Sequence, residues 1–237
     1  MTLRAGLWRT LAALLLLIVS YIPLTNASPV NAFTRSGPGL LYRRIQLGKI
    51  TVGDDDEFVG LRYVDKPKAD EYNDAETLTA IPAGGKTLGE GSYLSPQAGQ
   101  SPPMTDPWVC IVFGSRQKLL APTVPKLKVS FADLPSQLHE NDLQAWLQKY
   151  VSDAAAKYNL KNEMKYGQTL LFSAGQMVIP SHFLVHSKSY PQQASGTNSL
   201  GLKVHCVRVA DLDKLPEEEK KYFKLVAKWE SWKIHGW

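Results

Sequence analysis

The sequence lacks the patterns that identify several common kinds of site. It contains 2 cysteines in 237 residues, which excludes a disulfide-dense mini-scaffold and a four-cysteine zinc module. It has no G-x-S-x-G nucleophile elbow, no G-x-x-x-x-G-K-[ST] phosphate loop and no H-E-x-x-H motif, so hydrolase, P-loop and zincin chemistry have no local signature. No stretch has low-complexity bias, and the 44% of hydrophobic residues excludes a chain that is disordered throughout.

Long hydrophobic runs are missing as well. The longest apolar segment, Leu11–Ile22, is shorter than the roughly 20 residues that a membrane-spanning helix needs. Arg4 and Arg9 precede this segment and Pro23 follows it, an arrangement typical of a secretory signal peptide over residues 1–27. An uncleaved membrane anchor is the alternative. We expect cleavage, which predicts a secreted, extracellular protein with no membrane association afterwards.

The chain has little excess charge once this leader is removed. The full sequence carries a formal net charge of +5, and the first 27 residues contain two arginines and no acidic residue. The remaining chain therefore has 27 − 2 = 25 basic residues against 22 acidic ones, a net charge of +3. Nucleic-acid binding normally needs a denser basic stripe, so we expect no nucleic-acid partner.

Export changes the interpretation of the two cysteines. Cys110 and Cys206 lie in the apolar, strand-like runs Val109–Phe113 and Leu202–Val209. In an oxidising compartment a single pair most simply forms one disulfide. The alternative is a nucleophilic cysteine with His205 as its base, but neighbouring residues on a strand point to opposite faces. The sequence therefore favours a Cys110–Cys206 disulfide.

The hydrophobic pattern predicts an α+β fold in which strands dominate the middle of the chain. We expect an N-terminal arm over residues 28–56 and a single domain over residues 57–237. The predicted strands are Phe58–Val64, Val109–Phe113, Thr169–Phe172, Met177–Ile179 and Leu202–Val209, and the predicted helices are Asp65–Thr79, Leu138–Tyr158 and one that begins at Pro216. Residues 82–107 form a long predicted loop interrupted by the short unit Gly91–Ser95.

Two histidines have a spacing that can hold a metal on a helix. His182 and His186 are four residues apart, but Pro180 precedes them and no acidic residue completes a ligand set. Ordinary surface histidines explain this spacing better, and we expect no metal site.

Three separated segments carry a resemblance to a known family. The first is Phe58–Tyr63, an apolar strand that contains an arginine; the second is the Gly-rich Leu88–Pro96; the third is Ala174–Pro180. Their order resembles the ADP-ribosyltransferase toxin superfamily, over roughly residues 58–209. The resemblance implies a strand-rich two-sheet core with flanking helices.

The resemblance also implies roles for individual residues. Arg62 would bind the NAD phosphates or ribose, because a guanidinium makes bidentate phosphate contacts. Tyr93 would stack on nicotinamide, and Ser92 or Ser95 would form a hydrogen bond nearby. Gln176 occupies the position of the catalytic glutamate of the family, but glutamine carries no charge. Losing that charge would cost about 3–4 kcal/mol of transition-state stabilisation.

The sequence therefore predicts an eroded family member that is not an enzyme, similar to secreted effectors of plant-pathogenic fungi, especially smuts. It would need no cofactor and act as a monomer that binds a host or extracellular protein. Trp229, Trp232 and Trp237 are candidate contact residues, with packing onto the core as the alternative. An active secreted mono-ADP-ribosyltransferase or NAD glycohydrolase, which would use NAD, is the alternative function. A nuclease-like or cell-wall-binding module is a third.

Overall fold

The structure is a computed structural model, and it describes residues 44–80, 88–99, 104–130, 132, 140–173, 175–192 and 195–237. All of these residues belong to one compact unit, residues 41–237. The predicted signal peptide and Ala174 lie outside the described residues. No helix in the described ranges is both long and apolar enough to cross a membrane.

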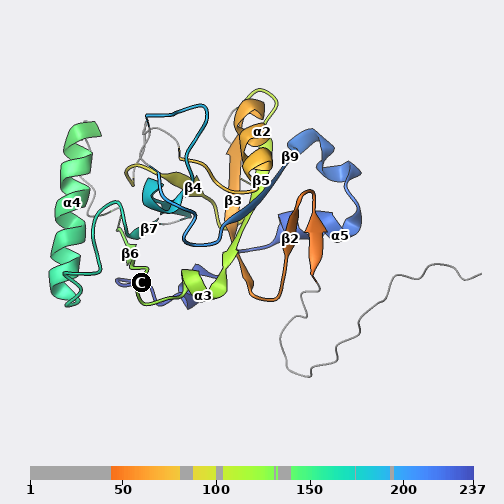
Figure 1. Cartoon of the computed structure of the whole chain (residues 1–237). Coiled ribbons are helices and arrows are strands. Elements are labelled where there is room, and N and C mark those ends of the chain that lie inside the picture. Colours follow the sequence, from red (N-terminus) through yellow and green to blue (C-terminus); the bar gives the residue numbers. More distant parts are fainter. Residues whose placement is uncertain are drawn as a thin grey trace, which may run out of the picture. The chain divides into compact units, whose positions relative to one another are not determined.

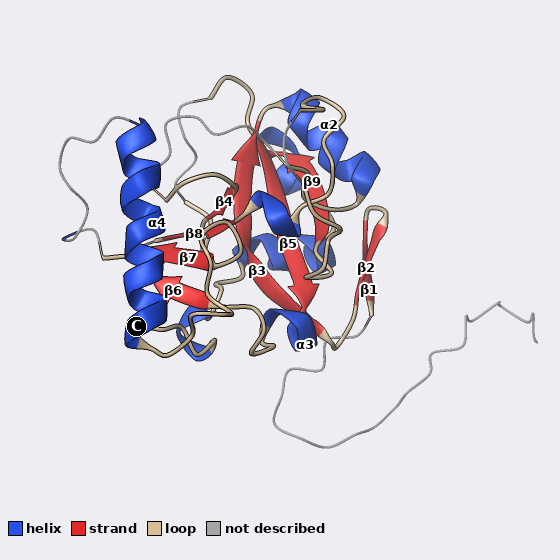
Figure 2. Ribbon diagram, turned by 60° about the vertical axis from the view of Figure 1, so that its left-hand side comes forward, coloured by secondary structure: helices blue, strands red, loops and turns tan. Residues whose placement is uncertain are grey.

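In the described ranges the strands form three sheets, which confirms the α+β class (Figures 1 and 2). The strands pair in the orders β1–β2, β3–β5–β9 and β4–β8–β7–β6, and all pairs are antiparallel except β6–β7. The strands are β1 Ile45–Leu47, β2 Ile50–Val52, β3 Asp56–Val64, β4 Ser92–Leu94, β5 Trp108–Ser115, β6 Lys126–Lys128, β7 Leu170–Ser173, β8 Gln176–Ile179 and β9 Lys203–Arg208. The α-helices are α2 Lys66–Ala75, α3 Arg116–Leu119, α4 Glu140–Lys157 and α5 Glu217–Lys220.

Three hydrophobic clusters hold the sheets together. The first lies between the two larger sheets and contains Phe172 of β7 and Val112 of β5. The second lies between the four-stranded sheet and α4, whose predicted apolar stripe is confirmed from Leu143 onward. The third lies on the opposite face of the β3–β5–β9 sheet, against the β1–β2 hairpin and the C-terminal segment. In both views α4 and the hairpin accordingly lie on opposite sides of the two larger sheets (Figures 1 and 2).

The β1–β2 hairpin corrects the predicted domain boundary. Residues 28–56 were expected to form an arm outside the domain, yet Leu47, Ile50 and Val52 are at most 4% exposed. They pack in the third cluster against Ile111 and Phe113 of β5. The described part of the expected arm therefore belongs to the packed domain.

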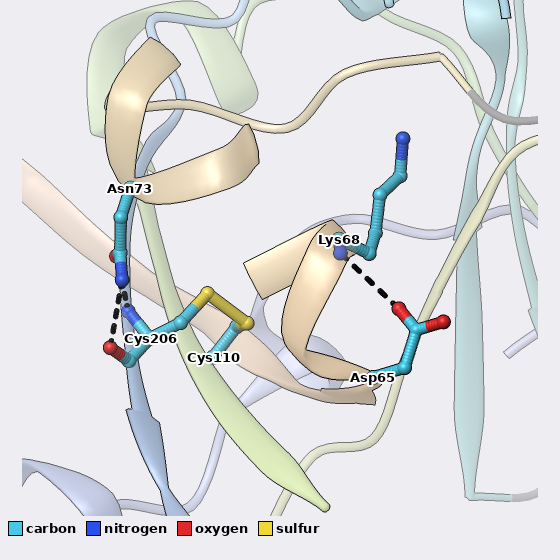
Figure 3. The surroundings of a disulfide bond; sticks show 5 residues. All are labelled: Asp65, Lys68, Asn73, Cys110 and Cys206. Carbon is cyan, nitrogen blue, oxygen red and sulfur yellow. Dashed lines mark hydrogen bonds between the residues drawn. A yellow bond between two sulfur atoms is a disulfide. The ribbon is translucent and has the colours of Figure 1, made fainter. Parts of the chain in front are cut away.

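Local sequence signals explain the ends of α2. Asp65 caps its N-terminus, because the Asp65 carboxylate accepts a hydrogen bond from the Lys68 amide at 3.1 Å. Glu76 takes a left-handed conformation with φ 55° and ends the helix, three residues before the predicted end at Thr79. The helix then covers the edge of β9, where the Asn73 side chain accepts from the Cys206 amide at 2.8 Å and donates to its carbonyl at 3.0 Å (Figure 3). An edge strand that is paired in this way does not present free backbone groups.

The predicted disulfide is confirmed. Cys110 of β5 and Cys206 of β9 are direct partners in the antiparallel ladder and are bonded to each other, as Figure 3 shows. Cys110 is 0% exposed and Cys206 is 2% exposed. His205 lies on the other face of β9, where its ring is in contact with Gly48 and near Phe223. The nucleophilic-cysteine alternative is therefore excluded.

The C-terminal segment differs from the helix predicted after Pro216. Only Glu217–Lys220 is α-helical, followed by 3-10 turns at Lys221–Lys224 and Trp229–Ser231. Tyr222 and Phe223 pack in the third cluster, whereas Trp229 packs in the first. A straight helix would place Tyr222 and Trp229, which are seven residues apart, on the same side and not against opposite faces of the β3–β5–β9 sheet.

Candidate functional site

Arg62, Tyr93 and Gln176 come from three distant segments and meet where β3, β4 and β8 lie side by side. They line a shallow hollow of about 210 Å³ together with Leu61, Tyr63, Leu94 and Ser95. We call it the strand-junction hollow. Within the four-stranded sheet, β4 pairs with β8 with Tyr93 opposite Val178. Leu61 of β3 and Ser95 exchange two backbone hydrogen bonds, each of 2.8 Å. The two sheets are therefore joined at one point, and the hollow lies beside it.

Two glycines allow this close approach. Gly60 lies at a β-bulge in β3 with φ 156°, and a Cβ there would be 2.7 Å from the Ser95 carbonyl oxygen. Gly91 has φ 143°, and a Cβ there would collide with the Ile179 carbonyl. Any other residue would push β4 away from β3 or β8. Gly91 of the second motif is thus explained by the junction of the strands.

Arg62 is the only charged residue among the described residues that line the strand-junction hollow. Its side chain is half-buried, and its Nη1 donates to the Tyr93 carbonyl at 3.0 Å. Its Nε is buried and has no hydrogen-bond partner among the described residues. Arg62 thus connects β4 to β3, while its Nε–H group has no acceptor among the described residues.

The two serines of the second motif lie on opposite sides of β4. Ser95 lines the hollow, whereas Ser92 is 0% exposed and lies beside the buried Tyr72 hydroxyl. Burial raises the pKa of Tyr72. Because side chains alternate along a strand, Ser92 faces the core and does not reach the hollow. Of the two predicted hydrogen-bonding serines, only Ser95 lies in the hollow.

The hydroxyl and the ring of Tyr93 are both fixed by contacts. Its hydroxyl accepts from the Leu88 amide at 2.8 Å and donates to the Gly89 carbonyl at 2.9 Å. Its ring packs against the cluster beneath α4. Burial raises the pKa of the Tyr93 hydroxyl, which therefore stays neutral. The Tyr93 side chain is therefore fixed in one position by its hydroxyl and by its ring.

Gln176 begins β8 after the tight turn at Gly175, where it is paired with Ser173 of β7. It lines the hollow but brings no carboxylate there. Two glutamates could supply a carboxylate only if the fold brought them to Gln176. Glu90 lines a separate cavity of about 240 Å³, and Glu163 is exposed in the turn after α4. Among the described residues, neither glutamate lines the strand-junction hollow.

Sequence reasoning missed an ionic network on α2. Lys68 and Glu71 form an ion pair of 3.0 Å, and their side chains are only 11% and 8% exposed. Lys68 also donates to Thr79 at 2.9 Å, and Glu71 accepts from the Ser187 hydroxyl at 2.7 Å and the Ser189 hydroxyl at 3.0 Å. The i, i+3 spacing of Lys68 and Glu71 indicates a possible ion pair on a helix. It does not indicate burial, because the loop at Ser187–Ser189 covers the pair.

The network sets the charge state of both partners. Burial lowers the pKa of Lys68, although Glu71 opposes this effect. Burial alone would raise the pKa of Glu71, but hydrogen bonds from Ser187 and Lys68 outweigh it and lower the pKa to about 2. The pair therefore fixes the loop at Ser187–Ser189 onto α2 as two opposite charges.

We expect Glu71→Ala to destabilise the protein by about 3 kcal/mol, because breaking a buried pair leaves the Lys68 ammonium without its carboxylate. The wild-type contribution of Glu71 is present above its unfolded pKa near 4.5 and is lost as the pH falls toward about 2. Urea unfolding followed from pH 6 to pH 3 measures both effects. Glu218→Ala is a matched control, since the Glu218 side chain is 80% exposed. Equal stability and equal pH dependence of the two variants would contradict the structural role of Glu71.

The histidine pair lies on the surface and outside any cluster of metal-ligating side chains among the described residues. His182 lies in a 3-10 turn, and both His182 and His186 are exposed. No group of three or more metal-ligating side chains occurs among the described residues.

The three C-terminal tryptophans differ in exposure. Trp229 and Trp232 are 3% and 2% exposed, and the Trp229 indole donates to the Val59 carbonyl at 2.8 Å. Trp237 is 51% exposed. Two of the three candidate contact residues are therefore core residues, as the packing alternative predicted.

No curated protein and no solved structure matches this chain. Residues 86–237 match a family of unknown function, DUF5910. The match includes Tyr93, Ser95 and Gln176 of the hollow, and it begins after Arg62. Because it covers more than half of the sequence, the chain belongs to the DUF5910 family.

Proposed function

We propose that this chain is a secreted, ADP-ribosyltransferase-like protein without transferase activity that acts by binding another protein. The observation that carries the proposal is the composition of the strand-junction hollow. The hollow is lined by Arg62, Tyr93, Ser95 and Gln176. A shared NAD site would require the three motif segments to meet in this way. The described lining contains a cation and no carboxylate, so nothing in it stabilises a developing oxocarbenium ion by charge.

The size of the hollow supports the same proposal. Its volume of about 210 Å³ is below the roughly 300–1,000 Å³ typical of pockets that enclose a drug-sized ligand. NAD is larger than such a ligand and would remain mostly outside. In addition, the Arg62 guanidinium already donates one hydrogen bond to the Tyr93 carbonyl, so this donor is not available to a ligand. A protein surface can still contact Arg62 and the exposed side of the junction.

The buried disulfide supports the proposed export. Cys110 and Cys206 form a bond that persists best in an oxidising compartment. Export to the extracellular space and a similarity to effectors of plant-pathogenic fungi remain parts of this proposal. The active transferase or NAD glycohydrolase is the competing function.

Restoring the missing charge tests the proposal. We expect the wild-type protein to show no NAD hydrolysis. Gln176→Glu is expected to raise NAD hydrolysis on the order of 10²–10³-fold above the wild-type background, the usual effect of one well-placed group in electrostatic catalysis. Release of nicotinamide, followed by chromatography, is the measurement.

Gln148→Glu is the matched control, because it adds the same charge on the exposed face of α4. If the wild-type protein hydrolyses NAD or labels a substrate, and Arg62→Ala abolishes this, the protein is an enzyme and the proposal is wrong. If neither Gln176→Glu nor the wild type acts on NAD, the resemblance of the hollow to a transferase site loses its support.

A further inference from the structure

A second and larger groove lies at the opposite edge of the four-stranded sheet, at β6, between α4 and the C-terminal segment. Its volume is about 560 Å³, within the range of ligand-binding pockets. We call it the α4 groove. It is lined by Leu127, Lys128, Ser130, Tyr150, Asp153, Ala154, Lys157, Tyr158 and Gly236. None of these residues lines the strand-junction hollow.

Backbone contacts fix the two walls of the α4 groove. The C-terminal segment runs beside β6, where the Lys128 amide donates to the His235 carbonyl at 2.9 Å and the His235 amide donates to the Lys126 carbonyl at 3.0 Å. Figure 2 shows the C-terminus beside α4 and β6. On the opposite wall, the Tyr150 hydroxyl donates to the Lys128 carbonyl at 3.3 Å. These hydrogen bonds fix the position of both walls of the groove.

The charge of the groove is positive. Lys128 and Lys157 both line it, and neither forms an ion pair with a described residue. The single acidic residue of the lining, Asp153, is paired with Lys149 at 2.7 Å. Two ammonium groups thus lack a carboxylate partner, whereas the one carboxylate has its cation.

Aromatic rings occur beside both lysines. The Lys128 ammonium lies 4.9 Å from the centre of the Trp237 ring, and the Lys157 ammonium lies 5.3 Å from that of Tyr158. Tyr158 is packed against the His235 ring at 4.8 Å. Among the described residues, Trp237 is one of four large apolar side chains that are exposed; it is not part of the groove lining but lies beside it, next to Lys128. A half-exposed ring beside a cation offers stacking area and a positive charge to the same ligand.

We propose that the α4 groove binds a small planar anion, an aromatic ring that carries a phosphate or carboxylate group. The ring packs against Trp237 and Tyr158, and the anionic group is bound by Lys128 and Lys157. This proposal is independent of the strand-junction hollow and of the proposed function.

Calorimetry with adenosine monophosphate as the probe tests the proposal, with adenosine and ribose 5-phosphate as the matched ligands that lack the phosphate or the ring. We expect the nucleotide to bind more tightly than either, and binding to weaken as salt is raised. Lys157→Gln and Trp237→Ala, both at exposed positions, are each expected to weaken binding about fivefold, as for the loss of one solvent-exposed contact. Lys66→Gln, at the exposed start of α2, is the control.

Absence of nucleotide binding at millimolar concentration would overturn the proposal. Equal binding of adenosine and the nucleotide, or unchanged binding in both variants, would overturn it as well. Thermal melts of each variant separate a lost contact from a lost fold. A Gln176→Glu variant, which changes only the strand-junction hollow, is expected to bind the nucleotide as the wild type does, so failure of one proposal is distinguishable from failure of the other.

Discussion

Deleting residues 232–237 is expected to unfold the protein. Trp232 is 2% exposed and Ile234 is 8% exposed. The Trp232 ring packs at 6.2 Å from the ring of Phe172, in the cluster between the two larger sheets. Removing a buried tryptophan alone costs about 3–5 kcal/mol, a large part of the roughly 5–15 kcal/mol that stabilises a domain. The deletion also removes the His235 backbone that pairs with the edge of β6 and exposes that edge.

A thermal melt followed by near-ultraviolet circular dichroism measures this effect. Trp237→Ala is the control, because Trp237 is half-exposed and its removal leaves the pairing with β6 in place. A cooperative melt of the truncated protein near the wild-type temperature would contradict the structure. It would instead favour a role of the C-terminal tryptophans as contact residues outside the core.

Replacing both cysteines by alanine is expected to destabilise the protein by about 4–5 kcal/mol, the chain-entropy estimate for a loop of this length. The disulfide joins residues 96 positions apart, so the unfolded chain gains much freedom when the bond is lost. Cys110 and Cys206 are also buried in the cluster between the sheets. The double variant avoids leaving one unpaired buried thiol, which would complicate the comparison.

Urea unfolding of the oxidised wild type and of the double variant measures the difference. Dithiothreitol added to the folded wild type is expected to act slowly, because both cysteines are at most 2% exposed. Reduction should accelerate with urea as the chain opens. A difference below 1 kcal/mol would show that the unfolded chain is already restricted without the bond, since the entropic contribution depends on that state.

Much of the fold could be predicted because its signals are local. The stripe from Leu143 to Tyr158 repeats at helical spacing and packs on one side of α4. The apolar runs around Cys110 and Cys206 became neighbouring strands β5 and β9. The pairing of these cysteines needed no geometry, because the chain contains only two. Three-residue strands such as β1 and β2 carry too few residues for a clear period, so the hairpin was missed.

The C-terminal segment shows where a strong local signal is misleading. Pro216 and three glutamates are a good helix start, yet the α-helix ends at Lys220. The aromatic residues that follow pack in two different clusters. Tyr222 lies on one face of the β3–β5–β9 sheet and Trp229 on the other. Tertiary packing outweighs the intrinsic helix propensity, which is worth less than 1 kcal/mol per residue for most residues.

The sequence by itself predicts a set of candidate site residues through a family resemblance. Arg62, Tyr93, Ser95 and Gln176 were selected from three short motifs, and the missing charge at Gln176 was visible without any structure. Only the tertiary structure decided that these residues share one hollow, that Ser92 is buried, and that the hollow is small. It also placed Lys128 and Lys157 in the lining of a second groove, with Trp237 beside Lys128. The reason is physical: composition and period follow from neighbouring residues, whereas a site depends on strands that pair across more than 80 residues of chain, such as β4 with β8.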